Sequence, residues 1–213
     1  LIVLGFVGFV YISNPVAAPS TDINSVRDVL PSNTEGNLFR IGTGSKAEFN
    51  IYELLNDKPF TVIGVTSDIA GEINFNPKDP ASLKISVIKI NARTLKTDSV
   101  KRDGAISRLI LKSEDPANEF IEFTPADIKL IPTEATSNDF MFNVTGNLKI
   151  SGIVKPTTFT VGLNVDDGLI SGTAEALINR SYYNLVIPNN PFVADVPNVL
   201  TIKAYIVANQ VLE

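Results

Sequence analysis

Apolar and polar residues alternate along most of the chain after residue 38, and this pattern predicts β-strands. Side chains at every second position of a strand lie on one face of the sheet. The clearest case is the stretch 144–165, where the apolar positions are first even and then odd: Val144, Leu148 and Ile150, followed by Phe159, Val161, Leu163 and Val165. Similar runs occur at residues 47–54, 58–75, 83–92, 118–123, 127–133, 140–150, 157–165, 169–179 and 198–209.

Short segments rich in Gly, Pro, Asn and Asp separate these runs, and the sequence DDG at 166–168 is a strong hairpin signal. About eight to ten short strands with turns at steady intervals are typical of antiparallel barrels and sandwiches. We therefore expect an all-β fold, a single antiparallel β-barrel of the lipocalin-like type with about eight strands.

One segment departs from the alternation. In residues 99–116, Ile106, Leu109 and Ile110 follow helical spacing, and Pro116 ends the pattern. We expect a short helix of about ten residues, with Ile106 and Leu111 turned inward. A helix inserted between the strands of a barrel usually covers one end, so we interpret this helix as a lid.

The first residues form an apolar run with no charge before Asp22. Residues 1–18 approach the length of about 20 apolar residues that a bilayer-spanning helix needs. We interpret them as a membrane anchor, with two alternatives: a signal peptide cleaved near the small residues of 16–18, or a buried core segment. The Pro- and Ser-containing residues 19–37 then form a linker, and residues 38–213 form the barrel domain.

The composition excludes several functions. The chain has 213 residues, a net charge of −5 and a pI of about 4.9, so the basic surface that nucleic acids require is absent. It contains no cysteine and no histidine, which removes disulfides, thiol chemistry, the commonest metal ligand and the commonest general base. We therefore predict a protein that is not an enzyme and has no metal site. The adjacent carboxylates at 114–115 and 166–167 are more typical of solvated turns than of a hydrolase site.

Nearly every predicted strand contributes an apolar face. If these faces meet inside a closed sheet of about eight strands, the interior can hold either packed side chains or one small ligand. The pattern alone leaves both alternatives open. An apolar ligand would gain roughly 25 cal/mol for each Å² of surface removed from water. The residues expected to contact it are Phe49, Ile51, Ile73, Phe75, Ile88, Ile90, Ile106, Leu109, Phe142, Phe159, Val161, Leu163, Ile202 and Ala204, with Tyr182 as a rim contact to a head group.

Several stretches, taken in order, resemble the YceI-like family of polyisoprenoid-binding domains. The most specific is VTGNLKISGIVKPTTFTV at 144–161, which contains the pattern G-x-L-x-x-x-G-x-x-K-P. The others are GSKAEFNIYE at 44–53, VIGVTSDIAGEINFNP at 62–77, the strand and helix region 87–111, and ALINRSYYNL at 176–185. The resemblance covers the chain from about Phe39 to Asn209. One departure is that many members carry a histidine in the first strands, and this chain has none.

The resemblance implies an antiparallel barrel with a lid helix and a lumen that holds isoprenoid chains, quinone-like lipids or fatty amphiphiles. It also implies a bacterial cell-envelope setting, either membrane-anchored and extracytoplasmic or secreted. We therefore predict a carrier that sequesters or transports a long-chain apolar lipid, with no cofactor besides such an isoprenoid-type lipid. Its expected contacts are this lipid and, through residues 1–18, a membrane; nucleic acid is not expected, and a homodimer is compatible with the sequence.

The alternative is a filled barrel that acts as a cell-surface interaction module, with no lipid ligand. It would meet a protein partner through exterior loops such as 188–198. The volume of the interior distinguishes the two functions, because a packed interior favours the module and an elongated apolar tunnel favours the carrier.

Overall fold

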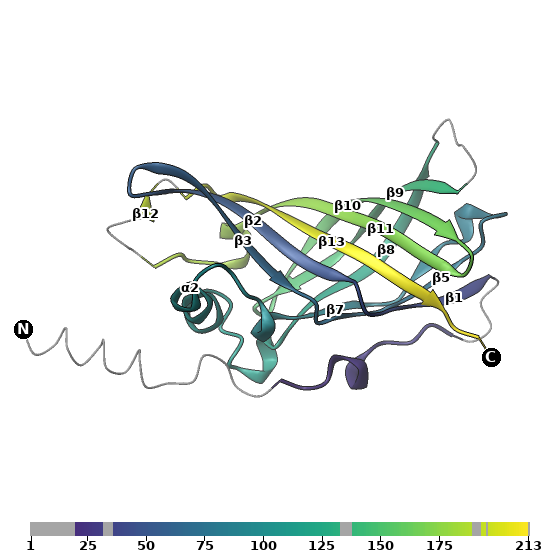
Figure 1. Cartoon of the computed structure of the whole chain (residues 1–213), viewed down its shortest axis with the longest axis horizontal. Helices are drawn as coiled ribbons and strands as arrows, with labels where there is room; N and C mark the ends of the chain where they lie inside the picture. The colour runs from purple at the N-terminus through teal and green to yellow at the C-terminus, as the bar shows by residue number, and fades with distance from the viewer. Residues whose placement is uncertain (1–19, 32–35, 133–137, 189–192, 195, 213) are drawn as a thin grey trace, which may run out of the picture.

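The fold is mostly β, as seen in a computed structural model that describes residues 20–31, 36–132, 138–188, 193–194 and 196–212. Strands of one antiparallel sheet make up most of it (Figure 1). The strands are β1 (Asn37–Ile41), β2 (Lys46–Leu55), β3 (Lys58–Thr66), β4 (Ile69–Ala70), β5 (Glu72–Phe75), β6 (Lys84–Ile85), β7 (Ile88–Asn91), β8 (Phe120–Ile131), β9 (Asp139–Ile150), β10 (Ile153–Asp166), β11 (Leu169–Asn179), β12 (Val193–Ala194) and β13 (Val199–Gln210).

The helical elements are short. The helix α2 (Val100–Ala105) continues directly into the π-helical turn η4 (Ile106–Ile110). Single 3-10 turns complete the described part: η1 (Ile23–Val26), η2 (Pro80–Ser82), η3 (Ala92–Thr94), η5 (Pro116–Asn118) and η6 (Arg180–Tyr183).

Tight hairpins connect the longest strands. In the two-residue loops between β2 and β3, β9 and β10, and β10 and β11, both central residues have positive φ angles. This is the backbone of turns that match the twist of the flanking strands, and it favours Asn, Asp and Gly. The loops are Asn56–Asp57, Ser151–Gly152 and Asp167–Gly168, and the last of these is the hairpin that the sequence DDG predicts.

The sheet curls into a half-barrel. Its strand order is β4-β7-β8-β9-β10-β11-β13-β1-β5-β6, while β2 pairs with β13 and β3. A backbone bond also joins β1 to the residue after β4, with Ile41 N donating to Gly71 O at 3.1 Å, and Ser86 N extends the β5–β6 pairing by donating to Glu72 O at 2.9 Å. An antiparallel, mostly-β fold with one short helix is thus confirmed. The expected single all-β barrel of about eight strands is corrected to a half-barrel of thirteen strands, of which β4 and β6 are only two residues long because the chain bends within the expected runs.

Two strand boundaries differ from the predictions. The runs 118–123 and 127–133 were expected as separate strands, but β8 continues through both with a register shift between Pro125 and Asp127. Proline has no N–H to donate to the ladder, so a bulge accommodates it inside one strand. The run 83–92 was expected as one long strand, but it is split into β6 and β7, which pair with β5 and β4 respectively.

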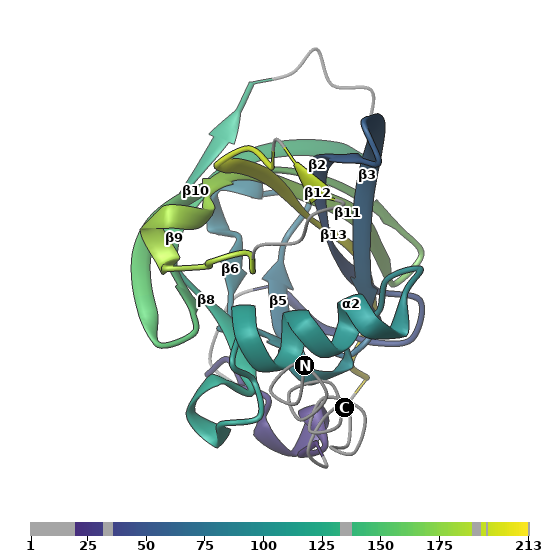
Figure 2. The same ribbon diagram turned by 90° about the vertical axis from the view of Figure 1, so that its left-hand side faces the viewer.

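The lid helix predicted from residues 99–116 is confirmed as the continuous segment α2–η4. Ser99 caps its N-terminus by accepting a hydrogen bond from Arg102 N at 3.4 Å. Ile106 and Leu111 are buried, as the helical spacing predicts. The helix crosses one end of the curled sheet (Figure 2), whereas β5 and the start of β9 lie at the opposite end. At that opposite end, the edge-to-face rings of Phe75, Phe140 and Phe142 pack together.

Residues 20–31, which the sequence analysis assigns to a linker, lie against the outside of the sheet. Ile23 is buried, and Lys89 Nζ donates to the carbonyl of Val26 at 2.7 Å. The buried carboxylates of Glu119 and Glu72 accept bonds from the backbone N–H groups of Thr21 at 2.6 Å and Leu30 at 3.0 Å. The segment is therefore a docked strap over part of its length.

The predicted anchor or signal segment, residues 1–18, lies outside the described residues. Within the described residues, no helix has the length and hydrophobicity that crossing a bilayer requires.

Candidate functional site

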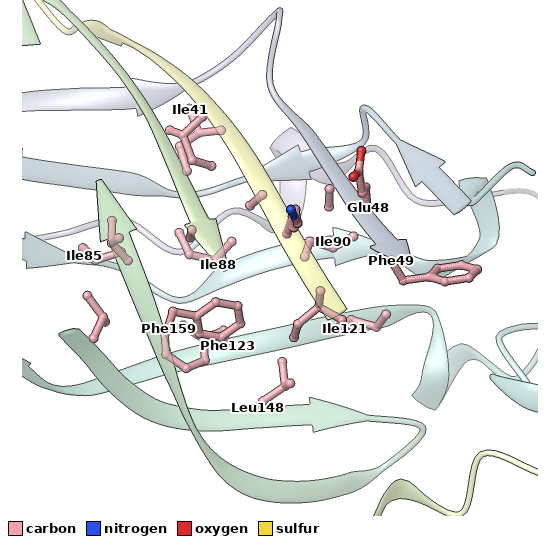
Figure 3. Close-up of a pocket in the computed structure, with 18 of the residues that line it drawn as sticks. Ile41, Glu48, Phe49, Ile85, Ile88, Ile90, Ile121, Phe123, Leu148 and Phe159 are labelled. Atoms are coloured by element: carbon pink, nitrogen blue, oxygen red, sulfur yellow. The ribbon is translucent and has the colours of Figure 1, made fainter. Parts of the chain in front are cut away.

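The curled sheet encloses an apolar cavity of about 150 Å³, which we call the inner chamber (Figure 3). Inward positions of most strands line it, because alternate side chains of each strand face the same side. Phe123 and Phe159 pack edge to face in its wall with their ring centroids 4.8 Å apart. The chamber therefore offers hydrocarbon surface and almost nothing else.

A row of alanines makes room for this chamber. Ala204 on β13 lies opposite Ala47 on β2 and also opposite Ala174 on β11, so the three methyl groups adjoin across neighbouring strands. All three residues line the inner chamber. Larger side chains in these positions would fill the space, so the cavity results from local sequence as well as from the curvature of the sheet.

Two charged residues, Glu48 and Lys203, belong to the same wall. They are register partners on β2 and β13, between the inward-facing neighbours Ala47, Phe49, Ile202 and Ala204. Strand alternation directs their side chains to the other face. The Lys203 ammonium bonds to the Glu175 carboxylate at 2.9 Å, and this bond raises the pKa of Lys203. Both charges are consequently part of the outer surface of the wall.

A larger cavity of about 650 Å³, the outer chamber, lies under the lid. Its walls come from β2, β3, β11 and β13, from the segment α2–η4 and from residues 185–188. Ile51, Ile106 and Leu109 contribute apolar surface. The view in Figure 2 shows α2 lying across this end of the sheet.

The outer chamber differs from the inner one because ionic groups lie on its lining. Glu53, only 6% exposed, faces Arg102 of α2, with Oε1 and Nη2 3.4 Å apart. Arg102 also pairs with Asp98 and lies over the ring of Phe60 at 5.6 Å. Lys101 and Ser99 complete this polar side. The outer chamber can therefore accommodate a polar group next to an apolar one.

Arg180 stabilises one wall of the outer chamber. Its guanidinium donates to the carbonyls of Pro197 at 3.1 Å, Leu185 at 3.3 Å and Val196 at 3.4 Å. These bonds hold η6 and the segment after it against residues 196–197. The arginine and the following residues thereby shape the wall that faces the lid.

The two chambers meet at a ring of shared side chains, which we call the collar. Phe49, Leu95, Ile121, Ile150 and Ile202 line both cavities. They come from β2, β8, β9, β13 and the segment after η3, so they surround the lumen. The two chambers therefore adjoin, and the collar lies between the deep chamber and the chamber under the lid.

The structure brings most of the predicted contact residues to this lumen. The inner chamber is lined by Phe49, Ile73, Ile88, Ile90, Phe159, Val161, Leu163, Ile202 and Ala204. Ile51, Ile106 and Leu109 line the outer chamber. Whether these residues contact a ligand remains a prediction, since their placement alone does not test binding.

Three predicted contact residues lie elsewhere. Phe75 and Phe142 are fully buried in the aromatic cluster beyond the inner chamber. Tyr182 is 59% exposed and is not part of either lining, whereas its neighbour Tyr183 is buried. The Tyr183 hydroxyl lies 3.3 Å from the hydroxyl of Thr157. Burial raises the pKa of Tyr183, and the bond with Thr157 opposes this effect.

Sequence reasoning missed several lining residues. Leu95 and Ile121 of the collar were not singled out, and Ile150 was named for its alternation but not among the expected contacts. The pair Glu53–Arg102 was also missed, although Glu53 continues the inward alternation of residues 47, 49 and 51. A carboxylate at an inward strand position is the signal that could have indicated a polar end of the lumen.

The other acidic residues considered have local roles. Glu114 pairs with Arg108 at 2.9 Å, and Asp115 accepts from Ala117 N at 2.9 Å to cap η5. Asp167 belongs to the hairpin turn after β10. Among the described residues, no group of acidic side chains has the arrangement of a metal site.

Comparisons with known proteins agree with this architecture. A family model described as "YceI-like domain" matches residues 41–208. No curated protein matches the chain at a significant level.

Solved structures with low sequence identity share the fold. The crystal structure of BcnA from Burkholderia cenocepacia has a TM-score of 0.60 at 18% identity, covering 78% of this chain and 96% of that chain. A domain from Saccharophagus degradans, described as a polyisoprenoid binding domain implicated in plant cell wall breakdown, has a TM-score of 0.61 at 11% identity, with coverages of 83% and 100%. The Campylobacter jejuni YCEI protein has a TM-score of 0.52 at 17% identity, with coverages of 70% and 85%.

Proposed function

The chain belongs to the YceI-like domain family, and from this premise we propose that it binds one long-chain apolar lipid in its lumen. The observation that carries the proposal is the pair of adjoining apolar chambers with the collar between them. The outer chamber alone, about 650 Å³, lies within the range of about 300–1,000 Å³ found for small-molecule sites.

The chemistry of the walls favours a hydrocarbon tail. A polar ligand in the inner chamber would lose its hydration without gaining hydrogen bonds, which costs several kcal/mol for each such group. A tail gains roughly 25 cal/mol for each Å² of apolar surface that leaves water. A tail that buries about 400 Å² would therefore gain about 10 kcal/mol before the costs of ordering and association.

The polarity of the two chambers favours one orientation of the lipid. The tail lies in the inner chamber, and the polar end lies under the lid near Glu53, Arg102 and Ser99. A single-tailed amphiphile with an isoprenoid, quinone-like or fatty chain satisfies both chambers. The Saccharophagus degradans domain, described as polyisoprenoid-binding, supports the isoprenoid class because it shares the fold.

The cellular role that we propose is sequestration or transport of this lipid in a bacterial cell envelope. The apolar residues 1–18 support this role as a membrane anchor or signal segment. The role requires no catalytic step. The alternative interaction module requires a filled interior, and the open volume of the two chambers argues against it.

The direct experiment is native mass spectrometry of the full chain, purified in a mild detergent, followed by lipid extraction and identification. We expect one long-tailed lipid per chain, and the same spectra report whether a homodimer forms. A protein that carries no lipid, and takes up neither farnesol nor ubiquinone from doped vesicles, would exclude the proposed function.

A further inference from the structure

From the contact between Phe49 and Gly64, we infer that these two residues determine how long a tail the lumen accepts. This inference rests on the proposed function. Phe49 contributes the aromatic side chain to the collar, whose other members are aliphatic. Its side chain is partly exposed, as are those of Ile121 and Ile202, whereas Leu95 and Ile150 of the same collar are buried. Phe49 therefore presents an aromatic ring between the two chambers.

The ring of Phe49 occupies the space that a side chain at position 64 would need. Phe49 and Gly64 are direct register partners on β2 and β3. A Cβ atom added to Gly64 would lie 2.5 Å from Cζ of Phe49 and closer still to Cε1. Carbon atoms in normal contact are about 3.5–4.0 Å apart. The ring and any side chain at position 64 are therefore mutually exclusive in this arrangement.

Because Gly64 has no side chain, the ring of Phe49 can lie against β3. Positions 62, 64 and 66 are the buried, inward-facing positions of this strand. In Figure 3 the ring of Phe49 points away from the cluster of Ile88, Phe123 and Phe159. The glycine thus provides a recess beside the collar, and the ring rests in it instead of standing across the lumen.

The recess sets the length of tail that can pass. Beyond the collar, the wall of β13 continues from Ile202 to Ile206, a depth of about 13 Å at the rise of a β-strand. A tail reaches this depth only when the ring is in the recess. With the ring displaced, the tail must end in the outer chamber.

The test compares Gly64→Ala, Phe49→Ala and the double variant Phe49→Ala/Gly64→Ala. Binding of geraniol and geranylgeraniol to the full chain in detergent is measured by native mass spectrometry. We expect Gly64→Ala to displace the ring and weaken geranylgeraniol binding at least about tenfold, with little change for the short geraniol. We expect the double variant to recover geranylgeraniol binding, because without the ring the methyl group has space.

Gly42→Ala is the matched control, because its added Cβ would meet only atoms at 3.9 Å. The inference is overturned if Gly64→Ala binds both alcohols like the wild type, or if it loses both equally and the double variant does not recover. If the wild type itself binds neither alcohol, the proposed function fails and this inference fails with it.

A second measurement covers the case in which Gly64→Ala does not fold. Because the wild-type ring rests in the recess, Phe49→Ala should bind geranylgeraniol about as tightly as the wild type. Phe49→Trp, whose larger ring the recess does not hold, should bind it at least about tenfold more weakly, and equal affinities of the Trp variant and the wild type would show that the side chain at position 49 does not limit the tail.

Discussion

Arg93 and Glu119 form an ion pair inside the protein, with Nη1 and Oε2 3.3 Å apart and side chains exposed by only 5% and 6%. Arg93 also donates to the carbonyl of Ser113 at 2.6 Å, and Glu119 accepts from Thr21. The pair consequently links the segment after the lid to the docked residues 20–31.

Removing one partner of this pair should destabilise the fold strongly. Glu119→Ala leaves the buried guanidinium without its carboxylate, and we expect the free energy of unfolding to fall by about 3–5 kcal/mol. Urea denaturation measures the change. Asp127→Ala is the control, because its pair with Lys129 is exposed, and it should cost less than about 1 kcal/mol. Equal effects of the two variants would contradict the structural role of the buried pair.

Alkaline pH should weaken the fold through Tyr183. Burial raises the pKa of this phenol above its ordinary value of 10.0. Above pH 10.0 the unfolded state releases this proton while the folded state still keeps it. The free energy of unfolding is therefore unaffected by the titration of Tyr183 below pH 10.0, and it falls as the pH rises from there through the raised pKa of the folded state. The loss can reach about 1.4 kcal/mol per pH unit.

Tyr183→Phe removes this dependence. At neutral pH we expect it to cost about 0.5–1.5 kcal/mol for the lost hydrogen bond with Thr157. The difference between the two proteins should shrink above pH 10.0. Urea denaturation at several alkaline pH values measures it, and a constant difference would show that Tyr183 titrates alike in both states.

Gly104→Ala should stabilise the lid. Gly104 lies in α2, and a Cβ atom there would have no neighbour within 4 Å. Replacing a helical glycine by alanine stabilises by about 0.5–1 kcal/mol, because it restricts the unfolded chain. The midpoint of urea denaturation should rise. Gly152→Ala should have the opposite effect, since Gly152 has a φ of +76° and alanine is strained there.

Filling the row of alanines should close the inner chamber. Ala204→Phe introduces a ring where Ala47, Ala174 and Ala204 adjoin. We expect affinity for a long-tailed lipid to fall at least about tenfold, since its tail loses the inner chamber. Lipid uptake followed by native mass spectrometry tests this. The control Ala126→Phe places the same ring on the exposed surface of β8, and unchanged uptake by both variants would contradict a tail in the inner chamber.

The alternating pattern predicted the inward faces and the lid helix because both depend on local periodicity. It identified Ile88, Phe159 and Ile202 as inward residues, and all three line the inner chamber. It did not distinguish them from Phe75 and Phe142, which are inward but belong to the aromatic cluster at the far end. Periodicity indicates which face of a strand a side chain lies on. How deep that side chain lies in the lumen depends on the pairing register between strands that are distant in the sequence.

The same limit explains the features that were missed. The collar forms only when β2, β8, β9 and β13 are in register, and none of these strands specifies it alone. The recess at Gly64 requires Phe49 on the paired strand. The docked residues 20–31 have the composition of a linker, and their attachment depends on buried carboxylates more than 40 positions away along the chain.

The attachment of Thr21 has a mechanical consequence. Its partner Glu119 connects through Arg93 and Ser113 to Ser107, which belongs to the π-helical turn of the lid. A displacement of the docked residues 20–31 would therefore disturb the contacts that hold the π-helical turn of the lid.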